Sequence, residues 1–233
     1  MINMVVFDMA GTTVNEGNIV YKTLQQSINA KGFDFTLEQV LAEGAGKEKF
    51  EAIKSILAHY ANNHDEELAA VIYKNFIAQL AMAYETFDIL PQSHAEKLFQ
   101  ELRKKNIRIA LNTGYNEETA WSLIDKLGWR EGVEFETLVT ADDVKNNRPN
   151  PDMIRLAMLR FGITDVSTVA KVGDSIIDIE EGKNARCGLT IGITSGAHTH
   201  DQLHSAEPDF IIDDLLELLP LLDKTNSLAR DVH

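Results

Sequence analysis

The sequence predicts an α/β protein: a doubly wound, mostly parallel, Rossmann-like sheet with an inserted helical cap domain. Short apolar runs of strand length alternate with longer segments of helical periodicity, which is typical of parallel strands joined by right-handed crossover helices. After the first apolar run, one long segment contains only helical patterns. With 44% hydrophobic residues in 233, the chain is large enough for a core with such an insert.

Six apolar runs predict the strands of the sheet, and five amphipathic segments predict the helices that cover it. The expected strands are Met4–Phe7, Ile107–Leu111, Thr137–Val139, Thr168–Val172, Leu189–Ile193 and Phe210–Ile212. The expected helices are Gln92–Lys105, Glu117–Leu127, Pro151–Phe161, Asp178–Ala185 and Leu215–Leu222. The polar tail, Lys224–His233, is expected to be frayed.

The insert is predicted to span residues 15–87, which leaves residues 1–14 and 88–233 to the core. It follows the end of the first strand, where a doubly wound sheet places its ligands, so we expect it to lie over the site as a cap. Its predicted helices are Tyr21–Ala30, Thr36–Leu41, Lys47–Ala61 and Glu66–Tyr84.

The chain is acidic: 36 Asp and Glu residues against 22 Lys and Arg residues give a formal net charge of −14. An acidic surface repels nucleic-acid phosphates and anionic lipid, so neither is expected as a partner. An acidic protein that bound a small anion would need a local group of cations, or a metal ion, to overcome its own field.

Nothing in the sequence suggests a leader or a membrane span. The N-terminal apolar run, Ile2–Phe7, is short and closed by Asp8, and acidic residues interrupt the apolar region Ile211–Leu222. The single cysteine, Cys187, fits a reducing compartment. We expect a cytoplasmic protein, and the sequence leaves open whether it forms a homodimer.

Polar residues stand at the ends of the predicted strands and in the loops that follow them. The carboxyl ends of parallel strands meet at one edge of the sheet, where an open α/β fold gathers its ligands. The residues that we expect at this edge are Asp8, Thr12, Thr113, Gly114, Tyr115, Arg148, Asp174 and Asp178.

These residue types suit phosphoryl transfer. Asp8 offers a carboxylate nucleophile, and Asp174 offers a hard oxygen ligand for Mg²⁺. Asp178 either binds this metal, directly or through water, or orients its neighbours Arg148 and Asp174. The metal would neutralise the repulsion between Asp8 and a phosphorus centre. The side chains and amides of Thr12, Thr113, Gly114 and Arg148 would hold the phosphoryl oxygens, and Tyr115 would either bind substrate or pack near the strand end.

The segments that carry these residues resemble the four motifs of the haloacid dehalogenase superfamily. These motifs are an Asp-x-Asp-Gly-Thr loop, a Ser or Thr strand end, a Lys or Arg, and a Gly-Asp-x-x-x-Asp loop. They stand here at Asp8–Thr12, Thr113, Arg148 and Gly173–Asp178, and the resemblance covers nearly the whole chain. It implies that Asp8 forms an aspartyl-phosphate with Mg²⁺ as cofactor, and that the backbone carbonyl of Ala10 is a further metal ligand. Ala10 replaces the second aspartate of the first loop, which is the general acid of typical members.

Within this superfamily the sequence is similar to the phosphonatase-like group, the phosphonoacetaldehyde hydrolases. The shared segments are Asp-x-Ala-Gly-Thr-Thr-Val at residues 8–14, Thr-Gly-Tyr at 113–115 and Arg-Pro-x-Pro at 148–151. The cap of that group carries a Gly-x-x-Lys segment, whose lysine forms a Schiff base with the substrate aldehyde. The resemblance therefore assigns this role to Lys49, three residues after Gly46, and leaves the nearby Lys47 as the alternative.

Ala10 and Lys49 suit the same reaction. Breaking a carbon–phosphorus bond expels a carbanion, and a lysine iminium accepts its electrons, so no acid is required at Ala10. Lys49 must then be partly neutral near pH 7, which requires burial or a neighbouring cation. An alternative interpretation places Lys49 on a solvated charged face with Glu48 and Glu51, and Ala52 stands where the group has a histidine.

The sequence thus predicts a Mg²⁺-dependent hydrolase of a small phosphonate that resembles phosphonoacetaldehyde. One alternative is a phosphomonoesterase that acts on a small metabolite such as phosphoglycolate, and another is a non-catalytic phosphate-binding protein. A dehalogenase is disfavoured because attack on carbon needs no metal and would leave Asp174 unexplained. His198, His200 and His204 are expected to be surface residues, because the site already has hard oxygen ligands.

Overall fold

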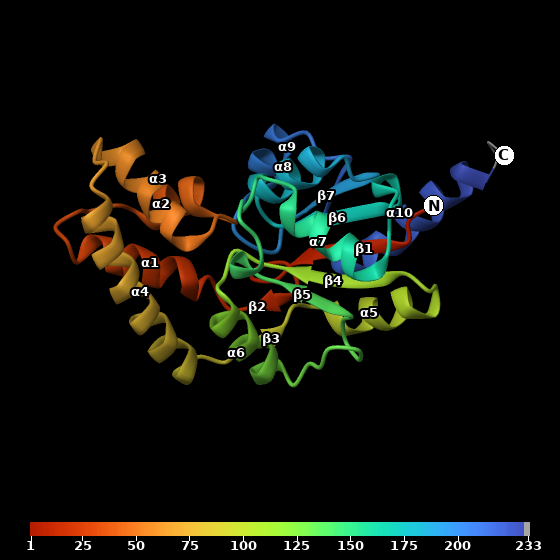
Figure 1. Ribbon diagram of the computed structural model, residues 1–233, viewed down its shortest axis with the longest axis horizontal. Helices are drawn as coiled ribbons and strands as arrows, with labels where there is room; N and C mark the ends of the chain where they lie inside the picture. Colours follow the sequence, from red (N-terminus) through yellow and green to blue (C-terminus); the bar gives the residue numbers. More distant parts are fainter. Residues whose placement is uncertain (231–233) are drawn as a thin grey trace.

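The computed structural model describes residues 1–230, and its centre is a parallel sheet of six strands in the order β5-β4-β1-β6-β7-β8 (Figure 1). Each neighbouring pair in this order is parallel, so the prediction of a doubly wound α/β fold is confirmed. The strands are β1 Met4–Asp8, β4 Arg108–Asn112, β5 Thr137–Val139, β6 Val169–Gly173, β7 Leu189–Ile193 and β8 Phe210–Ile212. Strands β1, β6 and β7 are buried along their whole length, which is why apolar residues dominate them in the sequence.

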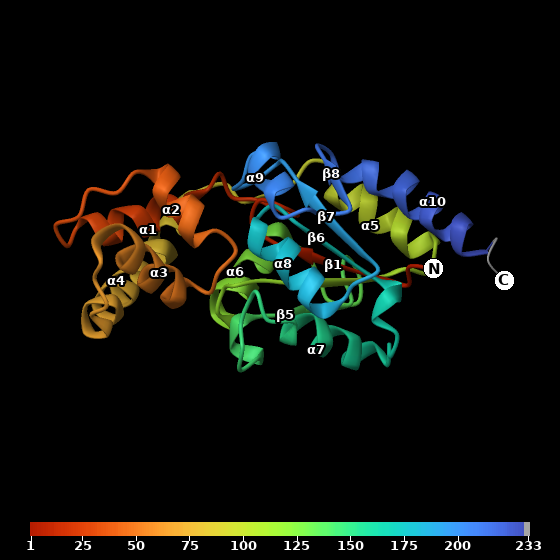
Figure 2. The same ribbon diagram turned by 90° about the horizontal axis from the view of Figure 1, so that it is seen from above.

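Helices cover the sheet on both faces (Figure 2). Alternate side chains of β1 point to opposite faces: Val5 and Phe7 join the apolar cluster of α5, α6 and α10, whereas Met4 and Val6 join that of α7. The α-helices of this part are α5 Ala95–Lys104, α6 Glu117–Leu127, α7 Asp152–Phe161, α8 Ile176–Ala185, α9 His200–Ser205 and α10 Leu218–Arg230. Short 3₁₀ turns lie at η1 Ala141–Asp143, η2 Val166–Thr168 and η3 Leu215–Glu217.

The C-terminal segment differs from its prediction. Helix α10 continues to Arg230, so residues 224–230 are helical rather than frayed, while residues 231–233 lie outside the described part. The backbone N–H of Ile2 donates to Asn226 Oδ1 at 2.7 Å, which ties this helix to the N-terminal segment. Helix α9 was also missed, although Thr199 and Gln202 form the capping box that begins it.

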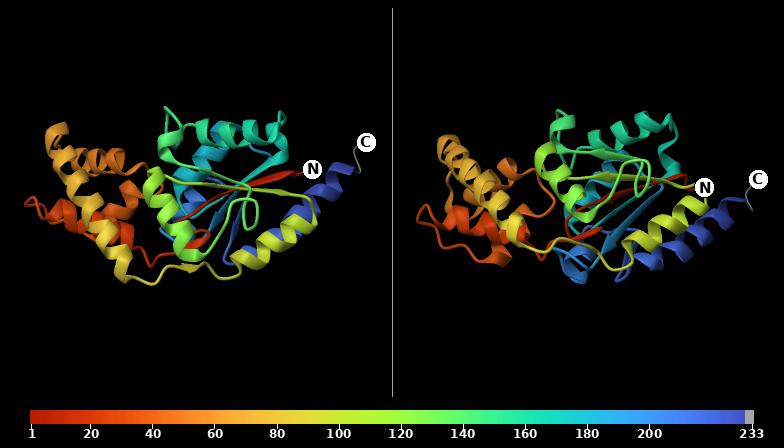
Figure 3. Two further views of the ribbon diagram at one scale, coloured as in Figure 1. Left: turned by 60° about the horizontal axis from the view of Figure 1, so that its bottom comes forward. Right: turned by 90° about the horizontal axis from the view of Figure 1, so that it is seen from below.

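Four further helices pack on one another at one end of the molecule (Figures 1 and 3). They are α1 Ile19–Asn29, α2 Leu37–Gly44, α3 Lys49–Ala61 and α4 Glu66–Thr86. Helix α3 begins at Lys49 and not at Lys47, because both carboxylate oxygens of Glu48 accept the first free N–H groups of the helix. None of the helices among residues 1–230 is long and apolar enough to cross a membrane.

The chain leaves the sheet for these helices, and returns from them, through a two-stranded ribbon. Strand β2, Val14–Asn15, pairs antiparallel with β3, Leu90–Pro91. The sequence does not predict this ribbon because two residues are too few to show a strand pattern.

Candidate active site

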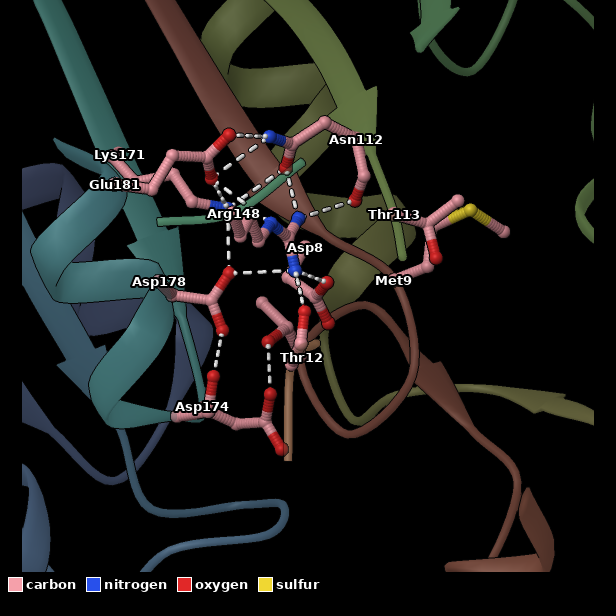
Figure 4. A network of polar contacts seen from close by, with 12 residues as sticks. Asp8, Met9, Thr12, Asn112, Thr113, Arg148, Lys171, Asp174, Asp178 and Glu181 are labelled. Carbon is pink, nitrogen blue, oxygen red and sulfur yellow. Dashed lines mark hydrogen bonds and ion pairs between the residues drawn. The ribbon is translucent and has the colours of Figure 1, made fainter. Parts of the chain in front are cut away.

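The site lies at the carboxyl ends of the three central strands, β4, β1 and β6 (Figure 4). Asp8 is the last residue of β1, Asn112 is the last residue of β4, and Asp174 follows the end of β6. The parallel register pairs Asp8 with Asn112, so the strand ends coincide at one edge of the sheet. This is the position that the sequence predicts for a ligand site.

A tight loop follows β1 and places Thr12 against Asp174. The carbonyl of Met9 accepts the N–H groups of Thr12, Thr13 and Val14 at 3.1, 2.9 and 2.8 Å. The Thr12 hydroxyl donates to Asp174 Oδ1 at 3.3 Å. Gly11 has φ +86°, and a side chain there would meet Asp174, so the loop requires glycine for both its backbone angle and its close approach.

Three buried carboxyl groups meet in the site. Asp8, Asp174 and Asp178 each offer an oxygen, and these atoms lie within 4.8 Å of one another. Burial, followed by repulsion from Asp8 and Asp178, raises the pKa of Asp174 well above its usual range. Burial and repulsion from Asp178 also raise the pKa of Asp8, against the opposing effect of Arg148. A divalent cation would remove this repulsion, and oxygen ligands of this kind suit Mg²⁺, so the residues present fit such an ion.

Arg148 is the buried cation at the centre of the site. Its Nη1 lies 2.7 Å from Asp8 Oδ1 and 3.0 Å from Asp178 Oδ1, and its Nε lies 3.0 Å from Glu181 Oε2. Its Nη2 donates to both oxygens of Asn112, the backbone carbonyl at 3.0 Å and Oδ1 at 2.6 Å. Burial alone would lower the pKa of Arg148, but its acidic partners outweigh that effect and raise it, so the guanidinium stays charged.

Lys171 is a second buried cation, at a position that the motifs of the sequence do not mark. Its Nζ lies 2.8 Å from Asp178 Oδ1 and 3.4 Å from Glu181 Oε2, and it donates to Asn112 Oδ1 at 2.8 Å. Burial opposes ionisation of Asp178, but Arg148 and Lys171 outweigh it and lower the pKa of that carboxyl. A lysine inside an otherwise apolar predicted strand was the available sequence signal, because a buried lysine requires acidic partners.

The loop after β4 contributes Thr113, Gly114 and Tyr115. The Thr113 hydroxyl accepts the N–H of Tyr115 at 3.2 Å. A Cβ on Gly114 would lie 2.7 Å from the carbonyl oxygen of Lys47, so the absence of a side chain lets the segment before α3 rest on this loop. Tyr115 is buried rather than half-buried.

Lys49 is buried, with 5% of its surface exposed, so the interpretation as a solvated charged face is wrong. Its Nζ donates to the carbonyl of Lys47 at 2.7 Å and lies 5.4 and 5.2 Å from the ring centroids of Tyr21 and Tyr115. Burial lowers the pKa of Lys49, against the opposing effects of Glu48 and Asp8. The structure thus buries Lys49 beside two tyrosine rings, and this burial favours the neutral amine.

Lys47 lies on the outer side of the same segment. Its ammonium group donates to Ser55 Oγ at 3.1 Å and pairs with Glu43 at 3.6 Å, and about a quarter of each charged side chain is exposed. Lys47 also lines a cleft of about 540 Å³ together with Glu48, Lys145 and Arg148. Of the two lysines, Lys49 is the one held beside the buried aromatic rings.

A hydrogen-bonded chain of buried residues, which the sequence does not predict, continues from Tyr115. The Tyr115 and Tyr84 hydroxyl oxygens are 2.8 Å apart, and Tyr84 donates to Glu16 Oε2 at 3.3 Å. Burial raises the pKa of Glu16 to about 7. No spacing in the sequence connects these three residues, because they come from three separate segments.

The three histidines of the 198–204 segment differ from one another. His200 and His204 are exposed, as predicted, but His198 is buried, so its assignment to the surface is wrong. His198 Nδ1 accepts the N–H of Ile176 at 3.0 Å, and its Nε2 lies 3.3 Å from the carbonyl oxygen of Leu41. It is buried because it bridges helix α8 of the sheet region and helix α2.

Comparison with known proteins identifies the family of the chain. The sequence model of the haloacid dehalogenase-like hydrolases matches residues 5–191. The chain is 33% identical to the phosphonoacetaldehyde hydrolase of Latilactobacillus sakei, over 82% of this chain and 75% of that protein. It is 27% identical to the phosphonoacetaldehyde hydrolase of Parabacteroides distasonis, over 97% of each.

A solved structure shares the fold. The phosphonoacetaldehyde hydrolase-like protein of Oleispira antarctica superposes with a TM-score of 0.84, over 97% of this chain and 93% of that chain, at 21% identity. The match to the sequence model and the relative at 33% identity establish the family, while this likeness supports the fold. The chain belongs to the haloacid dehalogenase-like hydrolases, an enzyme family, and within it resembles phosphonoacetaldehyde hydrolase.

Proposed function

We propose that the protein is a Mg²⁺-dependent, phosphonatase-like hydrolase that cleaves the carbon–phosphorus bond of a small phosphonate aldehyde through an aspartyl-phosphate. The observation that carries the proposal is the burial of Lys49 against two aromatic rings, in the same site as Asp8 and with Ala10 in the β1 loop. The resemblance to proteins named phosphonoacetaldehyde hydrolase supports it.

Lys49 prepares the substrate for bond cleavage. Its neutral amine attacks the aldehyde carbon, water leaves, and a protonated imine results. When the carbon–phosphorus bond breaks, its electron pair moves into this iminium and gives an enamine. Protonation of the enamine at carbon and addition of water then release acetaldehyde and restore the amine, so no acid is needed at Ala10.

Asp8 receives the phosphoryl group. One carboxylate oxygen of Asp8 attacks phosphorus while the carbon leaves, and water later hydrolyses the aspartyl-phosphate to free phosphate. Arg148, 2.7 Å from Asp8 Oδ1, orients the nucleophile and stabilises charge on the phosphoryl oxygens. The Thr12 and Thr113 hydroxyls and the Gly114 amide are proposed to bind the other phosphoryl oxygens.

Mg²⁺ would be held by Asp8 and Asp174, with the backbone carbonyl of Ala10 and with Asp178 directly or through water. When bound, the ion supplies positive charge that lets an anionic phosphonate approach the Asp8 carboxylate. Asp178 contacts both Arg148 and Lys171, so its own proposed part is to hold these two cations in place.

The helical segment of residues 15–87 is proposed to act as a cap. It supplies Lys49, and its Gly46 packs against the start of α8: a side chain on Gly46 would meet Ser175 and Ile177. Closure of this segment over the strand ends would exclude bulk water while the iminium forms and the carbon–phosphorus bond breaks.

Borohydride trapping tests the proposal. Incubation with Mg²⁺, phosphonoacetaldehyde and borohydride should inactivate the wild type and leave a reduced adduct on Lys49, identified by peptide mass spectrometry. Lys49→Arg should be inactive and unmodified, whereas the matched variant Lys47→Arg should be trapped like the wild type. A wild-type enzyme that stays active while Lys49 remains unmodified would refute the Schiff-base role.

A second measurement separates the phosphonatase from a phosphomonoesterase. Ala10→Asp supplies the acid that a phosphate-ester leaving group requires, so it should raise the activity toward phosphoglycolate and lower that toward the phosphonate. High phosphoglycolate activity in the wild type, with no trapping at Lys49, would instead favour the phosphomonoesterase.

A further inference from the structure

We propose that Glu16 is a positioning residue that stores the proton of Lys49 during Schiff-base formation, with the hydroxyl groups of Tyr84 and Tyr115 as the connection between them. The inference rests on the proposed function of Lys49. It assigns a role to a buried carboxyl group outside the acidic cluster of Asp8, Asp174 and Asp178.

The five residues concerned come from five segments. Glu16 follows β2, Tyr21 lies in α1, Lys49 begins α3, Tyr84 lies near the end of α4, and Tyr115 follows β4. All five are buried, with between 1% and 5% of their surface exposed. A carboxyl group with 1% exposure is costly to keep charged, so its presence beside a buried lysine requires an explanation.

The hydrogen bonds of this chain have one direction. Tyr84 donates its hydroxyl proton to Glu16 Oε2 at 3.3 Å, so in the 2.8 Å contact between the two hydroxyls Tyr115 must be the donor. The backbone N–H of Val20 also donates to Glu16 Oε2, at 2.9 Å. Both hydroxyl groups therefore donate in the direction of Glu16. This is the arrangement needed to pass a proton from Lys49 to the Glu16 carboxylate.

Among the carboxylates near Lys49, Glu16 is the one available to accept a proton, because the others are engaged elsewhere. Asp8 is held by Arg148, and Glu48 uses its two carboxylate oxygens to cap helix α3. Burial raises the pKa of Glu16 to about 7 and lowers the pKa of Lys49, so the two groups come closer in proton affinity. Tyr21, Tyr84 and Tyr115, which face them, are phenols whose pKa burial raises well above 10, so they stay neutral. Of the three, Tyr84 and Tyr115 relay the proton.

Glu16 receives one proton and returns one proton each time an imine forms. The Lys49 ammonium and the Glu16 carboxylate first exchange a proton, which gives the neutral amine and the neutral acid. The amine adds to the aldehyde carbon to give a carbinolamine. The Glu16 proton then returns along the same hydroxyls to the carbinolamine oxygen, which leaves as water, and the products are the iminium and the Glu16 carboxylate. In the first exchange the Lys49 ammonium, whose Nζ lies 5.2 Å from the centroid of the Tyr115 ring, gives its proton to the Tyr115 hydroxyl. In the return step the carbinolamine oxygen takes the place of the ammonium beside this hydroxyl.

The test follows Lys49 directly in the full-length protein. In a sample labelled with ¹³C at lysine Cε, the Lys49 resonance, assigned by its loss in Lys49→Arg, reports the pKa of this amine. Glu16→Gln removes a negative charge that favours the ammonium form, so the pKa of Lys49 should fall by roughly one unit. Glu85→Gln, an exposed position on the same helix as Tyr84, is the matched control and should leave the resonance unchanged.

Kinetics give the second readout. With acetaldehyde and borohydride, the rate of trapping at Lys49 at pH 7 should fall about 10- to 100-fold in Glu16→Gln. A plot of this rate against pH should also lose the change that the titration of Glu16 causes near pH 7. Tyr84→Phe keeps the Glu16 carboxyl group but breaks the chain of hydroxyl groups. It should therefore slow trapping, while the pKa of Lys49 stays at its wild-type value because the charge of Glu16 is still present. This second variant keeps the test decisive if Glu16→Gln does not fold.

Two failures are distinguishable. A folded Glu16→Gln whose Lys49 pKa and trapping profile equal those of the wild type would overturn the proton-storage role and leave the proposed function intact. A wild-type protein that borohydride does not trap at Lys49 with any aldehyde would overturn the proposed function and the storage role together.

Discussion

At the scale of single residues, the site depends on one guanidinium with many partners. Arg148 contacts Asp8, Asp178 and Glu181 by ion pairs and Asn112 by two hydrogen bonds, and it is almost fully buried. A buried charge network of this kind stabilises the fold only while it is complete, because removal of one partner leaves uncompensated charge.

Arg148→Lys should therefore be strongly damaging although it preserves the charge. A single ammonium group cannot reach Asp8, Glu181 and Asn112 together, so we expect kcat/KM to fall by about 10²-fold or more and the free energy of unfolding to fall by roughly 3 kcal/mol. Steady-state kinetics and urea unfolding measure the two effects. The exposed Arg155 provides the control, Arg155→Lys, and equal behaviour of the two variants would contradict this account.

The sequence predicts the residues that stand at strand ends but not their buried partners. Asp8 and Asp174 were predicted because each follows an apolar run and has oxygen ligands to offer. Lys171 and Glu181 were missed because their pairing depends on the packing of α8 against β6, which no local spacing encodes. Glu16 was missed for the same reason.

At the scale of elements, the segment before α3 determines where Lys49 lies. Gly46 has φ +74°, its N–H donates to the Tyr21 hydroxyl at 2.9 Å, and its carbonyl accepts from Arg148 at 3.5 Å. Helix starts were predicted within a few residues, and the largest functional difference is here, where Lys47 belongs to a turn and only Lys49 to the helix.

Gly46→Ala should separate the helix from the site. The new Cβ would lie against Ile177 and Ser175, so the segment must shift and carry Lys49 with it, and we expect borohydride trapping at Lys49 to fall at least tenfold. Gly32→Ala has the same kind of backbone penalty, with φ +92°, but nothing within 4 Å of the new Cβ. Gly32→Ala should lose about 1 kcal/mol of stability through its backbone angle and keep trapping, whereas Gly46→Ala should lose more stability because of the clash, and trapping with it. Equal trapping in both would contradict this role of Gly46.

At the scale of the whole molecule, His198 connects the sheet region to the inserted helices. Its two ring nitrogens face the N–H of Ile176 and the carbonyl of Leu41, an arrangement that fits a neutral imidazole with its proton on Nε2. Burial lowers its pKa below the ordinary value of 6.5. The folded protein thus resists protonation at a contact between its two parts.

The contribution of His198 to stability should therefore fall as the solution becomes acidic. Above pH 6.5 neither the folded nor the unfolded chain protonates this histidine, whereas below it the unfolded chain gains a proton that the folded chain refuses. Between pH 7 and 5.5 the wild type should lose about 1 kcal/mol more stability than His198→Gln, measured by urea unfolding at each pH. His200→Gln, at an exposed position, should keep the wild-type pH dependence, and a wild-type slope in His198→Gln would argue against the bridge.

The ribbon of β2 and β3 brings the two crossing points of the chain side by side, with Val14 opposite Pro91 and Asn15 opposite Leu90. Neighbouring strands lie about 5 Å apart, so the chain leaves the sheet region and returns to it at two closely spaced points. Any helical segment whose ends meet at that spacing could replace residues between the two strands without disturbing the parallel sheet. The paired strands thus allow the inserted helices, and Lys49 with them, to be exchanged as one unit while Asp8 and Asp174 keep their places at the strand ends.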